Sequence, residues 1–252
     1  MPEVLSHLTV LLLRLSGPMQ SWGDSSRFVR RTTRNEPTKS GVIGLMAAAL
    51  GRSREDSVED LAALEFGVRA DQPGNLIVDF QTEKTLGDAG KSMPLSYRYY
   101  LSDAKFLAAL GGDDELLKDI DAALKHPCWP LYLGRRSCPP DGPVSLGLHE
   151  EYEGVRDALG KAPWLASQAY RKKHSRTREL EAVCDAKADE EGISQADIPI
   201  TFSGSGRKYA NRKTWRCRIE ISGLEGETAP RKDGTDKQPI EFHGSHDPMS
   251  FF

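Results

Sequence analysis

Cations gather in a short polar stretch near the start of the chain. Residues 27–39 contain five Lys or Arg side chains and one acid, Glu36, and they run directly into the apolar segment SGVIGLMAAALG. The start of a helix exposes backbone N–H groups and carries a partial positive charge, and both features bind phosphate. The pattern favours contact with RNA or DNA, in which Gln20 and Trp22 would meet a base. The predicted contact residues are Gln20, Trp22, Arg27, Arg30, Arg31, Arg34, Lys39 and Ser40.

A second basic stretch, GSGRKYANRKTWRCR, lies in the C-terminal half. Residues 198–219 contain six Lys or Arg side chains and no acid. Backbone N–H groups around its two glycines could approach phosphate closely, so contacts are predicted at Arg207, Lys208 and Arg212. The alternative is an ordinary exposed strand, because alternation in TWRCRIE places Arg216 and Arg218 on one face and Trp215 on the other.

A third and weaker signal is the adjacent arginine pair in YLGRRSCP. A guanidinium group can hold a phosphate through two parallel hydrogen bonds, which makes Arg135 and Arg136, with Ser137 beside them, candidate contacts. The net charge of the whole chain is −3. Its sign changes along the sequence, and such asymmetry is typical of a protein with an anionic partner.

The motifs of common enzyme classes are absent from the sequence. It has no G-x-S-x-G, Walker or H-E-x-x-H motif, and its four cysteines show no C-x-x-C spacing. None of the six histidines belongs to a recognisable catalytic or metal-binding motif. We therefore predict no catalytic residue, no metal and no cofactor. The longest early apolar run is too short to cross a membrane and has no signal-peptide pattern, so we expect a cytoplasmic protein that contacts no membrane.

The expected elements place these residues on an α+β fold. A strand is predicted at 7–15, a helix from Ser40 as N-cap to Gly51, and a second short helix at 57–64. Strands follow in FGVRAD and NLIVDFQT, then a protruding loop or hairpin at 83–96 and a further strand. An amphipathic helix is predicted at 113–126, with Leu116, Leu117, Ile120 and Leu124 on one stripe. This order predicts a ferredoxin-like domain over residues 1–150. Residues 151–252 are expected to form a smaller β-rich region, with a charged segment at about 171–192.

Several segments resemble one known family. LRLSGPMQSWG, followed after a basic loop by PTKSGVIGLMAAALG, is similar to the opening of the type I-E (CasD) branch of the fifth CRISPR-associated (Cas) protein family. VDFQT, SYRYYLSDAKF, YLGRRSCP and GRKYANRKTW match in the same order. The resemblance therefore extends from the first strand to about Arg218, and its most specific parts are the opening block and YLGRRSCP.

The resemblance implies more than the residues show by themselves. Members of this family have an RRM-like fold with a protruding thumb hairpin, which the resemblance places at about residues 80–97. They are subunits of the Cascade complex, which recognises target DNA in antiviral defence. They cap the 5′ handle of the CRISPR RNA without cutting it, and they contact the terminal backbone subunit CasC and the large subunit CasA. The predicted partners are thus the RNA handle, these two subunits and, through the assembly, target DNA.

Two other functions remain open at this point. The related type I-C proteins are nucleases, so a metal-independent endoribonuclease that processes repeat RNA is the first alternative. Its acid–base groups would be sought at Tyr97, His126 and Tyr132. The second is a scaffold that contacts protein only, which leaves the three basic stretches unexplained.

Overall fold

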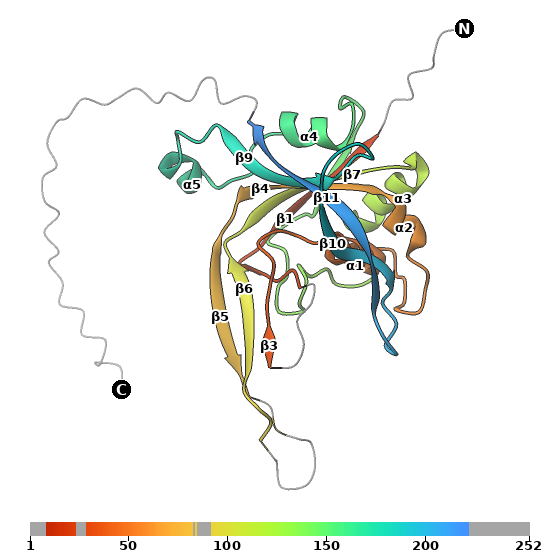
Figure 1. Cartoon of the computed structure of the whole chain (residues 1–252), viewed down its shortest axis with the longest axis vertical. Coiled ribbons are helices and arrows are strands. Elements are labelled where there is room, and N and C mark those ends of the chain that lie inside the picture. The colour runs from red at the N-terminus through yellow and green to blue at the C-terminus, as the bar shows by residue number, and fades with distance from the viewer. Residues whose placement is uncertain (1–8, 24–28, 83, 85–91, 222–252) are drawn as a thin grey trace, which may run out of the picture. The chain divides into compact units, whose positions relative to one another are not determined.

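An antiparallel sheet of seven strands forms the centre of the protein. The computed structural model describes residues 9–23, 29–82, 84 and 92–221. Across the sheet the strand order is β10-β11-β9-β4-β7-β1-β8 (Figure 1). The bounds of these strands are Val10–Ser16 for β1, Glu65–Gln72 for β4, Lys105–Gly111 for β7, Ser145–His149 for β8, Glu179–Asp185 for β9, Ile193–Thr201 for β10 and Lys208–Glu220 for β11.

Four of these strands form a ferredoxin-like unit. Chain order gives β1, helix α1 (Lys39–Ala49), β4, β7, helix α3 (Asp114–Lys125) and β8, and the strands lie in the order β4-β7-β1-β8. This is the split βαβ arrangement predicted from the sequence. The fold class is confirmed, because β9, β10 and β11 form the expected β-rich C-terminal part.

The C-terminal strands continue the sheet of the first part. β9 pairs with β4, with Val183 opposite Val68, so the hydrogen-bonded sheet crosses the boundary expected near residue 150. Side chains on β4 and β9 share one core cluster, since Val68, Phe66 and Val183 are all buried in it. The described residues consequently group into one compact unit that ends near residue 222.

The two faces of the sheet bury alternate side chains of β1. Leu11, Leu13 and Leu15 lie in the core cluster that includes α1, α3 and the residues around the short helix α2 (Glu59–Ala63). Val10 and Leu12 lie in the opposite cluster, under α4 (Val155–Lys161). Figure 1 shows α4 on one side of the sheet and α1, α2 and α3 on the opposite side. This alternation is the two-residue period of a strand.

Helix α1 begins two residues earlier than the sequence predicted. Thr38 is the N-cap, with extended backbone, and its hydroxyl accepts a hydrogen bond from the Gly41 N–H at 3.2 Å. The prediction of Ser40 as the cap was therefore wrong, because Ser40 already has helical backbone and its side chain is buried. Gly51 follows the helix with a φ of +76°, the left-handed conformation that favours glycine after a helix end.

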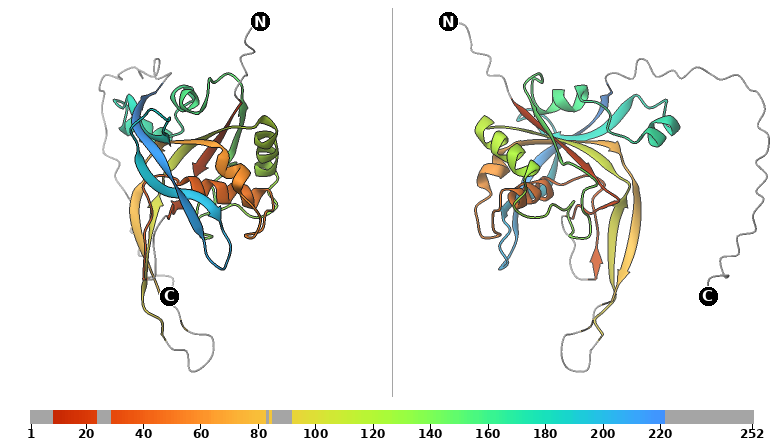
Figure 2. Two further views of the ribbon diagram at one scale, coloured as in Figure 1. Left: turned by 45° about the vertical axis from the view of Figure 1, so that its right-hand side comes forward. Right: turned by 180° about the vertical axis from the view of Figure 1, so that it is seen from behind.

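A long hairpin projects from the seven-stranded sheet. Its arms are β5 (Asn75–Gln81) and β6 (Ser96–Ser102), and both Figure 1 and Figure 2 show it extending away from the rest of the chain. The other edge of β6 pairs with β2 (Met19–Gln20) and, in parallel, with β3 (Arg30–Arg31). The predicted thumb at 80–97 corresponds to the outer half of this hairpin; residues 83 and 85–91 of it lie outside the described part.

No helix among the described residues is long and apolar enough to cross a membrane.

Candidate nucleic-acid interface

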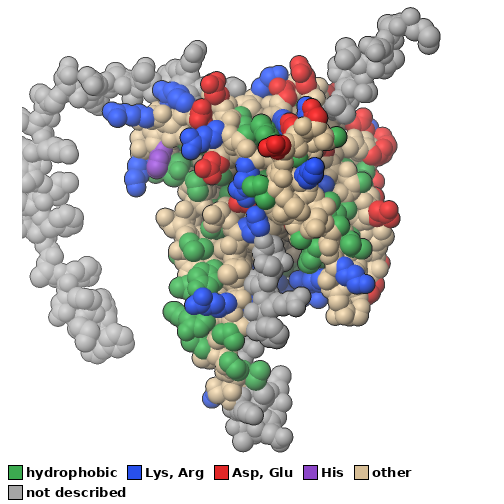
Figure 3. All heavy atoms as spheres, viewed as in Figure 1, with side chains coloured by type: hydrophobic (Ala, Val, Ile, Leu, Met, Phe, Trp, Pro, Cys, Tyr) green, Lys and Arg blue, Asp and Glu red, His purple; other side chains and the backbone are tan. Residues whose placement is uncertain are grey.

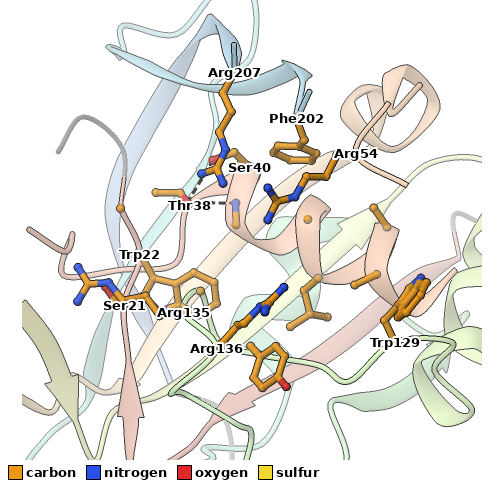
Figure 4. Close-up of a pocket in the computed structure, with 18 of the residues that line it drawn as sticks. Ser21, Trp22, Thr38, Ser40, Arg54, Trp129, Arg135, Arg136, Phe202 and Arg207 are labelled. Carbon is orange, nitrogen blue, oxygen red and sulfur yellow. Dashed lines mark hydrogen bonds between the residues drawn. The ribbon is translucent and has the colours of Figure 1, made fainter. Parts of the chain in front are cut away.

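A cleft of about 850 Å³ lies beside α1. Its walls come from the opening loop, from the face of α1, from residues 51–54 after the helix, from the loop at 129–136, and from the connection between β10 and β11. In Figure 4, Arg54, Arg136 and Arg207 extend from three of these segments toward the same space. We call this feature the arginine cleft.

The 129–136 wall is held against the opening loop by close backbone packing. Gly134 has a φ of +92°, and a Cβ there would lie 1.8 Å from the carbonyl oxygen of Ser21. The Ser21 N–H donates to the Leu133 carbonyl at 3.0 Å, and the Cys138 carbonyl accepts from Leu133 at 2.7 Å. The glycine of LGRRS is therefore needed for this approach, which presents the two following arginines to the cleft.

The lining of the cleft is strongly cationic. Six arginines line it, and none of its described lining residues is Asp, Glu or His. They are Arg31, Arg52, Arg54, Arg135, Arg136 and Arg207. In the described part of the chain the side chains of Arg31, Arg54, Arg136 and Arg207 make no ion pair, and all four are exposed. Such a surface attracts a polyanion and leaves its cations free to bind phosphate.

The other two lining arginines are already engaged within the protein. The two terminal nitrogens of the Arg135 guanidinium donate to backbone carbonyls, Nη1 to Tyr99 at 3.1 Å and Nη2 to Arg31 at 2.8 Å. Its Cζ lies 4.6 Å from the Tyr100 ring centroid. Arg52 forms a fork with Asp60 at 2.5 Å. This hydrogen bond raises the pKa of Arg52 and lowers that of Asp60. Arg135 therefore positions the wall, and Arg52 contributes only part of its charge.

Aromatic side chains stand between the arginines. Trp129 is 56% exposed at the cleft, and the lining also includes Tyr132, Phe202 and Tyr209. Phe202 packs above the helix, where a Cβ on Gly44 would lie 3.7 Å from its ring. Aromatic rings among unpaired arginines are the usual components of a single-strand nucleic-acid site, because bases stack on the rings while phosphates meet the cations.

Most of the residues predicted as contacts line the cleft or lie next to its lining. Lining it are Trp22, Arg31, Ser40, Arg135, Arg136 and Arg207. Arg30, Ser137 and Lys208 are exposed neighbours of these residues in sequence. Arg27 lies outside the described residues. Arg34 is directed elsewhere, since its guanidinium pairs with Glu36 at 3.4 Å.

Gln20 and Trp22 form a polar network in the core. The Gln20 amide donates to the carbonyls of Leu15 at 3.0 Å and Ala104 at 2.8 Å, and its oxygen accepts from the Trp22 indole at 3.0 Å. Both side chains are almost completely buried. The ring of Trp22 lies against Gly41, where a Cβ would approach it to 2.8 Å. The polar atoms of Gln20 are thus used inside the fold, and Gly41 leaves room for the Trp22 ring.

Lys39 and Arg212 belong to a second buried group, the internal ion cluster, which also contains Asp185 and Asp197. Arg212 donates to both Asp197 oxygens, at 2.7 and 3.0 Å, and to Asp185 at 2.6 Å. The Lys39 ammonium pairs with Asp185 at 3.2 Å, and its backbone N–H donates to Asp197 at 3.0 Å. The cluster therefore joins β9, β10 and β11 to the start of α1, and it occupies an N–H group that the sequence had suggested for phosphate.

The sequence analysis missed several lining residues. Arg52 and Arg54 follow the helix in GRSRED, where neighbouring acids balance their charge in sequence. Phe202 directly follows the last residue of β10. The signal for Trp129 was the aromatic, proline-rich run HPCWPLYLG, which has no core periodicity. Within the described residues no three His, Cys, Asp or Glu side chains gather in a way that could hold a metal ion.

Comparison with known proteins identifies relatives that are similar to this chain in sequence and in fold. A family model described as "CRISPR-associated protein (Cas_Cas5)" matches residues 10–214, which include every residue lining the arginine cleft. The chain is 35% identical over 175 residues to the "CRISPR system Cascade subunit CasD" of Escherichia coli (strain K12), covering 61% of this chain and 77% of that protein.

Two solved structures are similar over most of the chain. One, "Crystal structure of Cas protein", is 40% identical with a TM-score of 0.66, and the match covers 84% of this chain and 95% of the other. A chain of the "CRISPR RNA-guided surveillance complex" is 31% identical with a TM-score of 0.69, covering 84% of this chain and 90% of that one.

Proposed function

The chain belongs to the fifth family of CRISPR-associated (Cas) proteins, and from this premise we propose that it is the Cascade subunit that holds the 5′ handle of the CRISPR RNA. The observation that carries the proposal is the arginine cleft. There unpaired arginines share one space with the exposed ring of Trp129 and the partly exposed rings of Tyr132, Phe202 and Tyr209, without an acid among the described lining residues. The handle would lie in this cleft, and the complex would use the guide to recognise DNA in antiviral defence.

The composition of the cleft fits a single strand. Arg31, Arg54, Arg136 and Arg207 come from four separate segments, so an extended phosphate backbone could meet them in succession. Trp129 and Phe202 supply flat apolar faces on which unpaired bases stack. Arg30, Ser137 and Lys208 extend the cationic surface beyond the cleft, whereas Gln20, Lys39 and Arg212 would support it from inside.

We propose a binding role without catalysis. Cleavage of RNA without a metal needs a general base and a general acid within hydrogen-bond reach of the reacting groups. Of the three nuclease candidates, Tyr132 lines the cleft, whereas Tyr97 packs edge-on against Phe80 in the hairpin and His126 follows the end of α3. The described lining holds two tyrosines, Tyr132 and Tyr209, but no His, Asp or Glu to act as their general base, which favours binding over acid–base chemistry.

The projecting hairpin supports the proposal of protein neighbours. Leu76, Val78 and Phe80 of β5 lie on one face and are 60%, 43% and 57% exposed. Figure 3 shows hydrophobic side chains gathered along this hairpin. Exposed apolar patches of this kind mark protein interfaces. We propose that the hairpin contacts the terminal CasC subunit and that the chain also meets CasA. Its location would be the cytoplasm, where its RNA partner is made.

A titration of end-labelled repeat RNA in EDTA tests the proposal. The variant Arg136→Ala/Arg207→Ala removes two exposed cations that make no ion pair within the described chain. We expect it to bind the handle about tenfold or more weakly, with a salt slope reduced by about 1.4, since each lost phosphate contact removes about 0.7. The matched control, Lys118→Ala/Lys125→Ala, removes two exposed cations of α3 that lie away from the cleft and should bind normally.

The same titration separates the alternatives. A handle site in the cleft would be rejected by two results together. RNA with a scrambled handle would bind as well as the native sequence, and Arg136→Ala/Arg207→Ala and Lys118→Ala/Lys125→Ala would lose the same affinity. A shortened RNA product in EDTA that disappears with Tyr132→Phe would establish the endoribonuclease. Absence of RNA from the assembly purified from cells would favour the protein-only scaffold.

A further inference from the structure

A second cationic surface surrounds α5 (Gln168–Lys173), the short helix that follows α4. Residues 158–178 contain six Lys or Arg side chains and His174, but no acid. The six are Lys161, Arg171, Lys172, Lys173, Arg176 and Arg178. None of them lines the arginine cleft. We call the last five, from α5 and the turn after it, the α5 ridge.

The cations of the α5 ridge face solvent without acidic partners. Lys172, Lys173, Arg176 and Arg178 are all exposed. Within the described part of the chain no carboxylate pairs with these four, and Arg178 donates only to the carbonyls of Ser175 at 3.0 Å and Thr177 at 3.2 Å. Like charges this close repel one another, so the ridge costs folding energy unless an anion meets it.

The α5 ridge is fixed to the sheet. Both the N–H and the hydroxyl of Ser167, the N-cap of α5, donate to the Gln72 side chain, at 3.2 and 3.0 Å. The buried Trp164 donates to the Asp71 carbonyl at 2.8 Å and meets Tyr170 edge-on. Residues 71 and 72 end β4. The cations are thus presented at a defined place by hydrogen bonds and ring packing.

The ridge and the cleft occupy different regions. In Figure 1 and in the right view of Figure 2, α5 lies beyond the root of the hairpin, and α1 lies on the opposite side of that root. Figure 3 shows Lys and Arg side chains clustered over α5. One nucleic-acid strand held in the cleft would leave the α5 ridge free for a second anionic partner.

We propose that the α5 ridge binds the phosphate backbone of duplex DNA, independently of base sequence. Its aromatic rings are not available to bases, because Tyr170 stacks on His174 at 4.0 Å and is half-buried against Trp164. The side chains that remain are cations, which contact phosphates and carry no sequence information. An exposed ring beside arginines would favour a single strand, and such a ring, that of Trp129, is found in the cleft instead. This inference goes beyond the proposed RNA function and does not depend on it.

The test measures the binding of the full-length protein to a short labelled DNA duplex of arbitrary sequence at several salt concentrations. We expect Lys172→Ala/Lys173→Ala to bind the duplex about tenfold more weakly, with the salt slope reduced by about 2, or about 1 for each lost phosphate contact. Handle RNA should bind this variant normally. The cleft variant Arg136→Ala/Arg207→Ala should show the reverse pattern.

The control Lys118→Ala/Lys125→Ala removes the same charge from α3 and should bind the duplex like the native protein. A loss in this control equal to that in the ridge variant would overturn the proposal, because net charge alone would then explain it. The proposal would also be overturned if Lys172→Ala/Lys173→Ala bound the duplex with the affinity of the native protein. This holds even if that variant no longer contacted another protein. Failure of handle binding in the native protein would reject the cleft function and leave the duplex result standing.

Discussion

The arginine cleft and the internal ion cluster use the same residue types in opposite ways. Arg207 and Arg212 are five positions apart in one basic stretch. Arg207 is exposed at the cleft, whereas Arg212 is 8% exposed and donates to two carboxylates. The difference lies in the acids that the fold brings near: Asp185 on β9 and Asp197 on β10 reach Arg212, and the described cleft lining has none.

The comparison teaches that a basic run in sequence can serve two purposes. Arg212 and Lys39 neutralise the buried carboxylate of Asp197 and the partly buried carboxylate of Asp185. They thereby join α1, whose face lines the cleft, to β9–β11. Arg207 and Arg136 leave their charge free for a ligand. The number of cations counted along the chain overestimates the number available to a ligand, because some of them pair with acids that are distant in sequence.

The largest expected effect is on stability at Arg212. Arg212→Ala removes the cation that neutralises the fully buried Asp197 carboxylate, which then keeps only hydrogen bonds from uncharged donors such as the Gln195 amide. We therefore expect the free energy of unfolding to fall by about 3–5 kcal/mol. Urea unfolding followed by circular dichroism measures this. The matched variant Arg207→Ala should change it by about 0.5 kcal/mol or less. Equal free energies of unfolding for Arg212→Ala and Arg207→Ala would contradict the claim that only the arginine of the internal ion cluster stabilises the fold.

A smaller effect is expected at Trp129. Its indole is 56% exposed, so Trp129→Ala should leave folding unchanged while weakening handle RNA binding by about 1–3 kcal/mol, the usual value of one base–aromatic stack. Trp129→Phe keeps a stacking face and should retain most of the affinity. Handle RNA should also quench the fluorescence of the native protein more than that of Trp129→Phe. Full affinity of the alanine variant would remove base stacking from the description of the cleft.

The smallest effect is expected at Asp60. Its partner Arg52 lines the cleft, like Arg136, but is ion-paired, like Arg212 in the internal ion cluster. Asp60→Asn frees the Arg52 charge and should strengthen handle binding about twofold, in line with the modest value of exposed ion pairs. A filter-binding titration at low salt measures this change. The matched control Glu59→Gln removes a neighbouring exposed acid that pairs with no cation in the described chain, and it should leave the affinity unchanged. An equal gain in both variants would assign the effect to net charge.

The pH dependence of handle binding tests whether a group that titrates near neutral pH lies in the cleft. The Arg52 guanidinium lowers the pKa of Asp60 below its ordinary value, so the pair persists as the pH falls until that lowered pKa is reached. With no described His, Asp or Glu lining the cleft, handle affinity should stay constant between about pH 5 and pH 8, the range in which histidine titrates. A midpoint near the ordinary pKa of histidine would indicate an imidazole at the RNA.

Much of the fold was predictable from local patterns. The spacing of Leu116, Leu117, Ile120 and Leu124 predicted α3. The last three side chains are buried in the structure, and Leu116 is partly buried against the same core. The order of strands and helices predicted the ferredoxin-like arrangement, because each element shows its own period and turn signals. The start of α1 was missed, since Thr38 and Ser40 are both suitable caps and the choice depends on where the backbone leaves its extended conformation.

The site was predictable only in part. The LGRRS turn and the first basic loop were identified, and the structure brings Arg136 and Arg31 to one cleft. Arg54, Trp129 and Phe202 join them from segments that showed no binding pattern. Their positions depend on how α1, the 129–136 loop and the β10–β11 connection pack together, which no local pattern contains.

The sequence by itself determined the types and spacing of the elements, the presence of several basic stretches and, through its motifs, the family. These properties depend on residues close together in the chain, where side-chain periodicity and backbone preference act. Only the tertiary structure decided which cations are free. The charge of Arg212 is neutralised by acids 15 and 27 positions away, and that of Arg136 is left to solvent, because electrostatic energy depends on distance in space.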